Sequence, residues 1–421
     1  MTPTREPSSG LSRREMLANS GMGFATLALS QLLSGDRLLG AESGVPSHGG
    51  ATVLHHPARA KSVIMLMQNG GPSQMELFDP KPALQRHAGT VYRDKVEMFQ
   101  PGSEGNTLLP CPFRFEPRGQ CGTQISEALP HLGAIADDLC LVRSMRGEHN
   151  NHTESLVMIT SGKILPGRPT LGAWVSYALG TENENLPAFV VLRDPEGYPG
   201  TGATLWQNGW LSPNHRGTEF NTKGEPVLNL QSATAMPAGA EADDLEFLAK
   251  LNRLHQRDYP HEPVLESRIR NYELAARMQL AAGGVLELSR ESESSRKMYG
   301  LDNPVTAPYG TRLLMARRLV ESGVRFVQVF CGVGNPWDSH KDVKGEIQQI
   351  AAKTDLPSAA LVRDLKQRGL LESTIVLWTG EFGRLPVSQH SQGRDHNRNG
   401  FSLLLAGGGF KSGIAYGQTD D

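Results

Sequence analysis

The sequence predicts an α/β fold, a three-layer sandwich in which helices cover both faces of a central, mostly parallel sheet. Short apolar runs lack the alternation with polar residues that a half-exposed strand shows. Segments with helical periodicity separate these runs along the chain. Strands that are apolar throughout are buried on both faces, which is typical of parallel sheets flanked by helices.

The individual elements follow from these patterns. The predicted strands are 62–68, 139–143, 188–192, 324–330, 374–378 and 402–406. The predicted helices are 125–137, 154–161, 170–179, 242–257, 262–283, 307–322 and 354–369. Residues 195–240 are rich in Gly, Pro, Asn and Ser and predict a long loop excursion. We expect 62–68, 324–330 and 374–378 to be neighbours in one sheet.

The first 41 residues have the pattern of an export signal. Arg13 and Arg14 precede a mildly apolar stretch of small residues, and Ala41 is a candidate cleavage point. This pattern predicts a twin-arginine signal (1–41) that is read by the Tat export machinery, and hence a periplasmic or secreted protein. The alternative is an ordinary amphipathic helix that carries two arginines. Residues 42–60 are predicted to be a polar linker, which leaves 61–421 as the folded domain.

Composition excludes several classes of partner. Lys and Arg number 42 against 44 Asp and Glu, a formal net charge of −2, which argues against a nucleic-acid-binding protein. No apolar run reaches the roughly 18 residues that a spanning helix needs, so no transmembrane segment is expected in the mature form. No nucleotide cofactor is expected either.

Candidate metal ligands gather where predicted strands begin or end. Asp338 and His340 follow the strand at 324–330, and side chains two residues apart in an extended segment share a face. Asp395 and His396 stand just before the strand at 402–406. Carboxylates mixed with imidazoles suit Zn²⁺ or Mn²⁺ better than Ca²⁺. We therefore predict a site for one or two divalent metal ions, although each histidine alone is also compatible with an ordinary hydrogen-bonded role.

Two more polar residues follow predicted strands. Glu381 lies between glycines after 374–378, and Asn69 follows 62–68 at a position where an aspartate would be an obvious metal ligand. The carboxyl ends of parallel strands meet at one edge of the sheet, so both are expected to face the same cleft as Asp338 and His396.

A further candidate element starts at "HNNHTES". His152 and Thr153 fall at the first turn of the predicted helix, where exposed N–H groups stabilise an anion. A hydroxyl placed there beside a metal could be a nucleophile, so Thr153 and His152 are the candidate catalytic residues. The alternative for Thr153 is an N-cap that accepts a backbone N–H.

Several motifs give the chain a family resemblance. They are "NGGPSQMELFDPKP" (69–82), "GRPTLGAWVSYALGTENENLPAFVVL" (167–192), "WDSHKD" (337–342), "GEFGR" (380–384) and "GRDHNRNGFSLLLAGGG" (393–409). Together they resemble the DUF1501 family, exported bacterial proteins that are abundant in planctomycetes and grouped with the alkaline phosphatase and sulfatase superfamily. The resemblance implies an alkaline phosphatase-like domain over 61–421. Because family members continue beyond "GIAYGQTDD", a truncated or divergent C-terminal end is also expected.

The superfamily resemblance implies a plan with two metal ions at the carboxyl edge of the sheet. The Asp/His/His set of one metal is matched by Asp338, His340 and His396. At the other metal, Asn69 replaces the first aspartate, and Glu381 with Phe382 replaces an Asp-His pair. Phe cannot bind a metal, and a neutral amide is a weaker ligand than a carboxylate. The resemblance thus implies one intact site and one that is degraded or rebuilt.

Two functions are compatible with these features. One is a periplasmic metal-dependent hydrolase of phosphate or sulfate esters, acting on a small molecule or a polysaccharide ester. A sulfatase that relies on formylglycine is excluded because no C/S-x-P-x-R motif occurs in the chain. The other is a non-catalytic exported protein, for binding or envelope assembly, that retains the fold.

Overall fold

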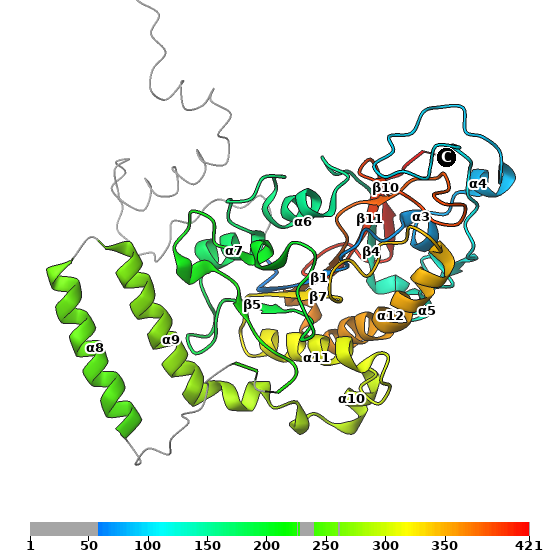
Figure 1. Ribbon diagram of the computed structural model, residues 1–421. Helices are drawn as coiled ribbons and strands as arrows, with labels where there is room; N and C mark the ends of the chain where they lie inside the picture. The colour runs from blue at the N-terminus through cyan, green and yellow to red at the C-terminus, as the bar shows by residue number, and fades with distance from the viewer. Residues whose placement is uncertain (1–57, 225, 228–239, 260–261, 421) are drawn as a thin grey trace, which may run out of the picture. The chain divides into compact units, whose positions relative to one another are not determined.

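The computed structural model describes residues 58–224, 226–227, 240–259 and 262–420 (Figure 1). The residues from Arg59 onward form one compact unit. The predicted signal at 1–41 and most of the predicted linker at 42–60 lie outside the described residues. Among the helices that the structure describes, none combines the length and apolar character needed to cross a membrane.

A central sheet contains eight of the described strands, in the order β12-β4-β11-β8-β1-β7-β5-β6. Their bounds are β1 (Ser62–Met67), β4 (Cys140–Met145), β5 (Phe189–Leu192), β6 (Thr218–Glu219), β7 (Phe326–Phe330), β8 (Thr374–Thr379), β11 (Phe401–Gly407) and β12 (Ile414–Tyr416). Within this sheet β11 runs antiparallel to β8 and β4, while the other pairings are parallel. The predicted mostly parallel sheet is confirmed, and β1 lies between β7 and β8 as expected.

The register of the three central strands brings their carboxyl ends together. Met67, the last residue of β1, pairs with both Phe330 of β7 and Thr379 of β8. The segments that follow these strands therefore leave the sheet side by side. This arrangement places Asn69 and Glu381 at the same edge as the loop after β7.

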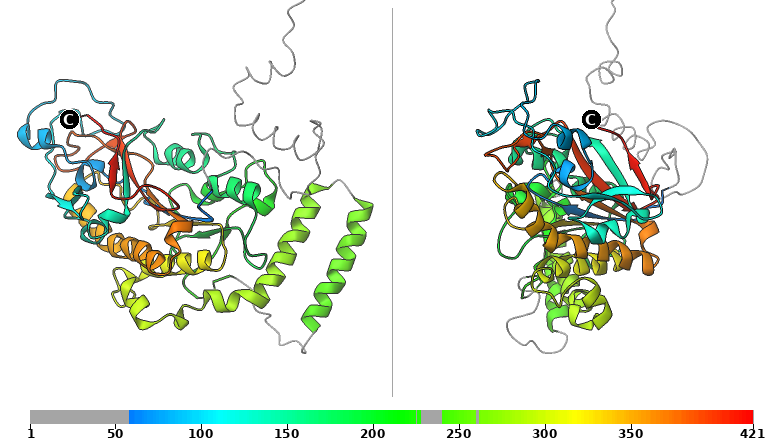
Figure 2. Two further views of the ribbon diagram at one scale, coloured as in Figure 1. Left: turned by 180° about the vertical axis from the view of Figure 1, so that it is seen from behind. Right: turned by 90° about the vertical axis from the view of Figure 1, so that its right-hand side faces the viewer.

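Helices cover both faces of the sheet (Figures 1 and 2). Side chains of β1 alternate, so that Ile64 and Leu66 join the core beneath two helices while Met65 and Met67 join a second core on the opposite face. The first core is closed by α11 (Ala307–Glu321) and α12 (Val343–Gln367), and the second includes residues of α6 (His152–Ser161) and α7 (Leu171–Leu179). The predicted three-layer sandwich is therefore confirmed.

The described part of the chain also forms six other α-helices, two small antiparallel strand pairs and the loop excursion. The other helices are α3 (Gln74–Leu77), α4 (Pro82–Arg86), α5 (Pro130–Gly133), α8 (Ala240–Asp258), α9 (Pro263–Leu286) and α10 (Glu293–Met298). Two small antiparallel pairs are formed by β2 (Phe115–Arg118) with β3 (Thr123–Ser126) and by β9 (Gly383–Arg384) with β10 (His396–Asn397). The predicted loop excursion at 195–240 contains the edge strand β6 and two short 3-10 helices in its described part.

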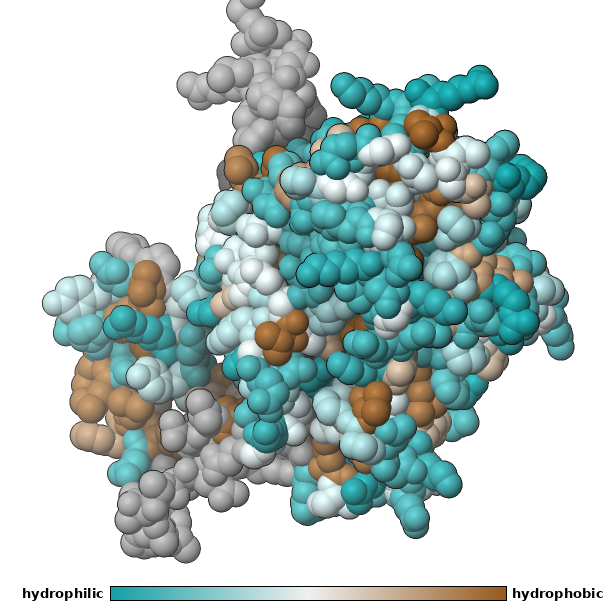
Figure 3. Space-filling model, turned by 45° about the vertical axis from the view of Figure 1, so that its right-hand side comes forward, coloured by the Kyte–Doolittle hydropathy of each residue, from teal (hydrophilic) through white to brown (hydrophobic). Residues whose placement is uncertain are grey.

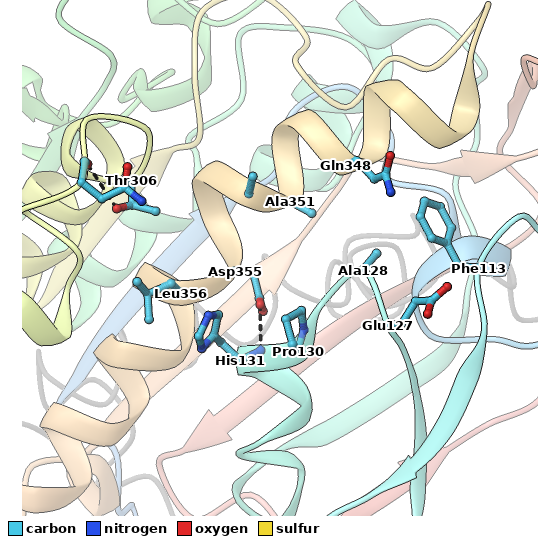
Figure 4. A pocket seen from close by; sticks show the side chains of 12 residues that line it. Phe113, Glu127, Ala128, Pro130, His131, Thr306, Gln348, Ala351, Asp355 and Leu356 are labelled. Atoms are coloured by element: carbon cyan, nitrogen blue, oxygen red, sulfur yellow. Dashed lines mark hydrogen bonds between the residues drawn. The ribbon is translucent and has the colours of Figure 1, made fainter.

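One predicted helix is wrong. The segment 125–137 forms the end of β3, the short α5 and a 3-10 turn. Pro130 begins α5, and Asp355 of α12 caps it from outside by accepting the backbone N–H groups of His131 and Leu132 at 2.7 and 2.8 Å. Figure 4 shows Asp355 and the start of this helix in direct contact in the lining of one pocket. Tertiary contacts, rather than local periodicity, thus set the structure of this segment.

A second helix is longer than the periodicity indicates. The prediction starts at 354, whereas α12 starts at Val343 because Asp342 caps it, its carboxylate accepting the N–H of Gly345 at 3.0 Å. The longer α12 begins three residues after His340, so it anchors the loop that carries the candidate ligands.

Candidate metal centre

Four connections meet at the carboxyl edge of the sheet. The loop between β7 and α12 carries Asp338 and His340, and the short strand β10 carries His396. Glu381 follows β8, and His152 is the first residue of α6. The structure therefore brings together side chains that are far apart in the chain.

Three of the predicted ligands converge on a small triangle. Asp338 Oδ1 lies 2.8 Å from His340 Nε2 and 3.1 Å from His396 Nε2, and the two imidazole nitrogens are 3.0 Å apart. Atoms at these separations can all lie about 2.0–2.2 Å from one point, which is the distance expected for nitrogen and oxygen ligands of zinc. The triangle thus has the size of a metal coordination face.

The outer nitrogen of each imidazole fixes the tautomer. His396 Nδ1 lies 2.6 Å from the carbonyl oxygen of Asn150, which can only accept a hydrogen bond. His340 Nδ1 faces Oε1 of Gln389, whose amide nitrogen donates to Pro101 O at 2.9 Å. In its neutral form each imidazole would therefore carry hydrogen on Nδ1 and present a lone pair on Nε2. In that form the two lone pairs would face the Asp338 carboxylate, and a cation among the three atoms would satisfy all of them.

A buried arginine holds the carboxylate in this position. Arg384 is fully buried and donates to Asp338 Oδ1 at 2.6 Å, to Gly71 O at 2.9 Å and to Arg394 O at 3.1 Å. Burial would raise the pKa of Asp338, but the hydrogen bond from the His152 imidazole and the charge of Arg384 hold this pKa well below its usual range. Asp338 is therefore a carboxylate, the form that a metal ligand requires.

His396 is the most enclosed ligand. Its side chain is fully buried, and burial lowers its pKa to about 4 against the raising effect of Asp338. The ring lies between Phe99, stacked at 5.3 Å between centroids, and Phe382, at 4.5 Å. The other ligands are more open, with 24% of the Asp338 side chain and 17% of the His340 side chain exposed. Within the triangle, solvent therefore reaches Asp338 and His340 but not His396.

His152 and Glu381 form an ion pair beside the triangle. His152 Nδ1 lies 2.8 Å from Glu381 Oε1, which also accepts the N–H of Gly70 at 2.9 Å, and His152 Nε2 lies 3.2 Å from Asp338 Oδ2. Burial would lower the pKa of His152, but its hydrogen bonds with Asp338 and Glu381, together with their charges, raise it to about 9. Glu381 thus holds the His152 imidazole in place, and the Phe382 ring packs on this imidazole with 4.9 Å between the ring centroids.

Asp395 has a different set of partners. It lies close enough to share an ion with His340 and His396, with one ligand atom from each within 4.8 Å of the others. Its oxygens, however, already accept three backbone N–H groups, those of Phe99 at 2.6 Å, Gln100 at 2.8 Å and His396 at 2.8 Å. These bonds make Asp395 the anchor of the loop that carries Phe99.

Asn69 faces away from the triangle and links β1 to the loop after β7. Its amide nitrogen donates to Gly332 O at 3.2 Å and to Gly334 O at 2.5 Å, and its amide oxygen accepts from Cys331 Sγ at 3.2 Å. An aspartate cannot donate to either carbonyl. The donor requirement of this buried position therefore accounts for asparagine where the two-metal plan has an acid.

We expect Asn69→Asp to lower the free energy of unfolding by on the order of 3 kcal/mol at pH 7, because a buried carboxylate would face two carbonyl oxygens. Burial raises the folded-state pKa of such a carboxyl above its unfolded value, so its protonated form is favoured in the folded protein. Stability should therefore be lost as pH rises, with a larger deficit at pH 8 than at pH 5. Urea unfolding at both pH values measures this, with the exposed Asn185→Asp as the matched control. Equal deficits at both pH values would contradict the prediction.

The start of α6 differs from the expected cap. Asn151, not Thr153, occupies the N-cap position, so the prediction of Thr153 as an N-cap is wrong. Thr153 lies in the first turn and is exposed to solvent. The side chain that reaches the triangle from this turn is His152. The nucleophilic role of Thr153 stays a prediction.

Four contributors were not anticipated from the sequence. They are Phe99, Asn150, Arg384 and Gln389. Arg384 lies within the quoted "GEFGR" motif, but no local pattern there indicates that it pairs with Asp338. The other three act through loops that are distant from their histidine partners in the chain, so spacing carries no signal for them.

Comparisons with solved structures returned distant likenesses. The lipoteichoic acid synthase LtaP from Listeria monocytogenes is 8% identical, over 85% of this chain and 68% of that chain, with a TM-score of 0.36. The alkaline phosphatase from the Antarctic bacterium TAB5 is 9% identical, over 83% and 92%, with a TM-score of 0.32. The PsFucS1 sulfatase from Pseudoalteromonas sp. is 12% identical, over 85% and 64%, with a TM-score of 0.32.

At these identities and scores the likenesses assign no activity. No curated protein matches the chain. The family comparison is specific, since the profile described as "Protein of unknown function (DUF1501)" matches residues 60–421. The chain therefore belongs to the DUF1501 family.

Proposed function

We propose that this protein is a metal-dependent hydrolase of phosphate or sulfate esters that holds one divalent cation through Asp338, His340 and His396. The observation that carries the proposal is the convergence of three ligand atoms that lie 2.8 to 3.1 Å apart. Two imidazoles and one carboxylate favour Zn²⁺ or Mn²⁺. Three protein ligands with an accessible fourth side are typical of catalytic rather than structural zinc sites.

The chemistry of the site follows from its charges. A divalent cation bound here would act as a Lewis acid toward an oxygen of the ester. His152 presents Nε2 beside Asp338 and is the side chain positioned to donate a proton to the departing oxygen of the ester. Glu381 fixes the His152 ring through Nδ1. Thr153, exposed on the same turn of α6, is the proposed nucleophile.

A second candidate function is favoured by a different observation. Phe382 and Asn69, which stand where the two-metal plan has ligands, have structural partners instead, namely the imidazoles and the carbonyls after β7. A protein with a single cation and no turnover would be a non-catalytic exported protein for binding or envelope assembly. The substrate of the hydrolase, small molecule or polysaccharide ester, is likewise part of the proposal, as are periplasmic location and Tat export.

Metal content and turnover together test the proposal. We expect about one equivalent of Zn²⁺ or Mn²⁺ per chain by mass spectrometry of the purified protein, and metal-dependent hydrolysis of p-nitrophenyl phosphate, bis(p-nitrophenyl) phosphate or p-nitrophenyl sulfate. His396→Ala and His340→Ala should both lose the metal, while His87→Ala, at an exposed histidine, should keep it. Thr153→Ala should keep the metal and lose turnover.

The outcomes separate the two functions. Metal binding with turnover supports the hydrolase, and metal binding without turnover on any of the three esters supports the non-catalytic role. No metal in the folded wild-type protein, after dialysis against Zn²⁺ or Mn²⁺, would overturn the metal site itself. Circular dichroism of each variant shows whether it has folded.

A further inference from the structure

The helical hairpin of α8 and α9 carries an exposed apolar stripe. On α8 the exposed fractions are 63% for Phe247, 41% for Leu248, 45% for Leu251 and 50% for Leu254. These residues recur at helical spacing and therefore lie on one face of α8. Figure 1 shows α8 and α9 side by side, and Figure 3 shows hydrophobic side chains gathered on the hairpin at the left of the view.

The face of α8 that is less exposed is the less apolar one. Leu245, Ala249, Asn252 and Gln256 are half-buried and recur at intervals of four, three and four residues. This stripe includes an alanine and two amides, whereas the outward stripe consists of three leucines and a phenylalanine. A helix in water normally buries its more apolar face, so α8 is arranged to be covered by a partner.

The charges on α8 identify the orientation of that partner. Three exposed acidic residues, Asp243, Asp244 and Glu246, lie in the first half of the helix, and three exposed basic residues, Lys250, Arg253 and Arg257, lie in the second half, which also ends in the exposed Asp258. A parallel copy of α8 would oppose like charges at both ends. An antiparallel copy opposes acidic to basic residues at both ends while its apolar stripe meets the same stripe in the middle.

We propose that α8 is a self-association surface, on which a second copy of this chain docks its own α8 in antiparallel orientation. The same patch on both copies is self-complementary, which is the requirement for a two-fold symmetric dimer. An anionic membrane is a poorer occupant because the acidic half of α8 would be repelled by it. This proposal is independent of the metal centre.

Sedimentation velocity of the full chain over a range of concentrations tests the proposal. We expect a dimer. We expect Leu251→Glu to raise the dissociation constant of that dimer by about a hundredfold, because both copies carry the substitution and two carboxylates would be buried in one interface. The matched control is Leu165→Glu, at a leucine that is 70% exposed and lies outside the hairpin, and it should leave the dimer unchanged. A wild-type protein that stays monomeric at about 100 μM would overturn the proposal.

A charge exchange tests the orientation. Asp244→Arg and Arg257→Asp should each weaken the dimer, by about tenfold, because each places like charges against each other at both ends of the helix pair. The double variant restores opposite charges only in the antiparallel arrangement and should return the dissociation constant toward the wild-type value. No recovery in the double variant would overturn the antiparallel pairing. Monomeric protein that binds vesicles of phosphatidylglycerol through α8 would overturn self-association in favour of a lipid surface.

Discussion

Asp338→Asn is expected to abolish binding of the proposed metal and to lower the proposed ester hydrolysis about a thousandfold, the largest expected effect on activity. A bound cation supplies several kcal/mol of transition-state stabilisation, and each 1.4 kcal/mol changes the rate tenfold. The asparagine would keep the size of the side chain but lose the charge that contacts both imidazoles. Its amide would also leave Arg384 without an anionic partner.

Metal content per chain and hydrolysis of p-nitrophenyl esters measure this effect on the same preparation. Asp302→Asn, at an exposed aspartate away from the triangle, is the matched control and should keep both metal and activity. A fully metal-loaded Asp338→Asn protein would contradict the ligand assignment. If the variant lost turnover but kept its full metal content, Asp338 would be needed for the reaction and not for metal binding.

Glu76→Ala is expected to lower the free energy of unfolding by about 3–5 kcal/mol, the largest effect on stability. Glu76 and Arg394 are both fully buried, and Glu76 Oε1 accepts from Arg394 at 2.7 and 3.0 Å. Removing one partner leaves the other charge buried and unpaired, which costs far more than the pair contributes. Urea or thermal unfolding measures the change.

Two comparisons sharpen this prediction. Glu196→Ala breaks an ion pair with Lys223 in which the side chains are 71% and 75% exposed, and it should cost less than about 1 kcal/mol. The double variant Glu76→Met, Arg394→Met removes both charges and should be less destabilised than Glu76→Ala alone. A Glu76→Ala protein as stable as Glu196→Ala would show that Arg394 reaches solvent.

The sheet was predictable because its physical cause is local. The central strands are largely buried on both faces, so β1, β7 and β8 appear in the sequence as mostly apolar runs without regular alternation, and their common direction follows from the helices between them. The segment 125–137 was mispredicted for the opposite reason. Its structure depends on Asp355, a residue more than 200 positions away, which caps α5.

The metal triangle was predictable for a similar reason. Asp338, His340 and His396 stand next to strands whose ends meet at one edge, so strand assignment alone brings them close. What spacing cannot reveal is the hydrogen bonding that orients them. Gln389 and Asn150 fix the tautomers of the two histidines through contacts between separate loops.

Asn69 shows a further limit of sequence reasoning. Its position after β1 indicates a ligand, and a reading by residue type alone treats the amide as a weakened acid. The structure gives the amide two carbonyl acceptors, for which nitrogen hydrogens are required. A polar residue at a strand end therefore indicates where a site lies more securely than it indicates what that residue does there.

The adjacency of Asp395 and His396 has a consequence for dynamics. The Asp395 carboxylate accepts hydrogen bonds from the backbone amides of Phe99 and Gln100, and His396 contributes a nitrogen atom to the triangle. Because the ring of Phe99 also stacks on His396, ordering of this loop and retention of the proposed cation would be thermodynamically linked.

Because of this linkage, hydrogen exchange of the loop amides would report whether the proposed cation is bound. Chelation should shorten the hydrogen-exchange lifetimes of the Phe99 and Gln100 amides, whereas the amides of β1, in the middle of the sheet, should keep theirs. By the same reciprocity, a ligand that presses Phe99 onto His396 would raise the affinity of the site for the proposed cation.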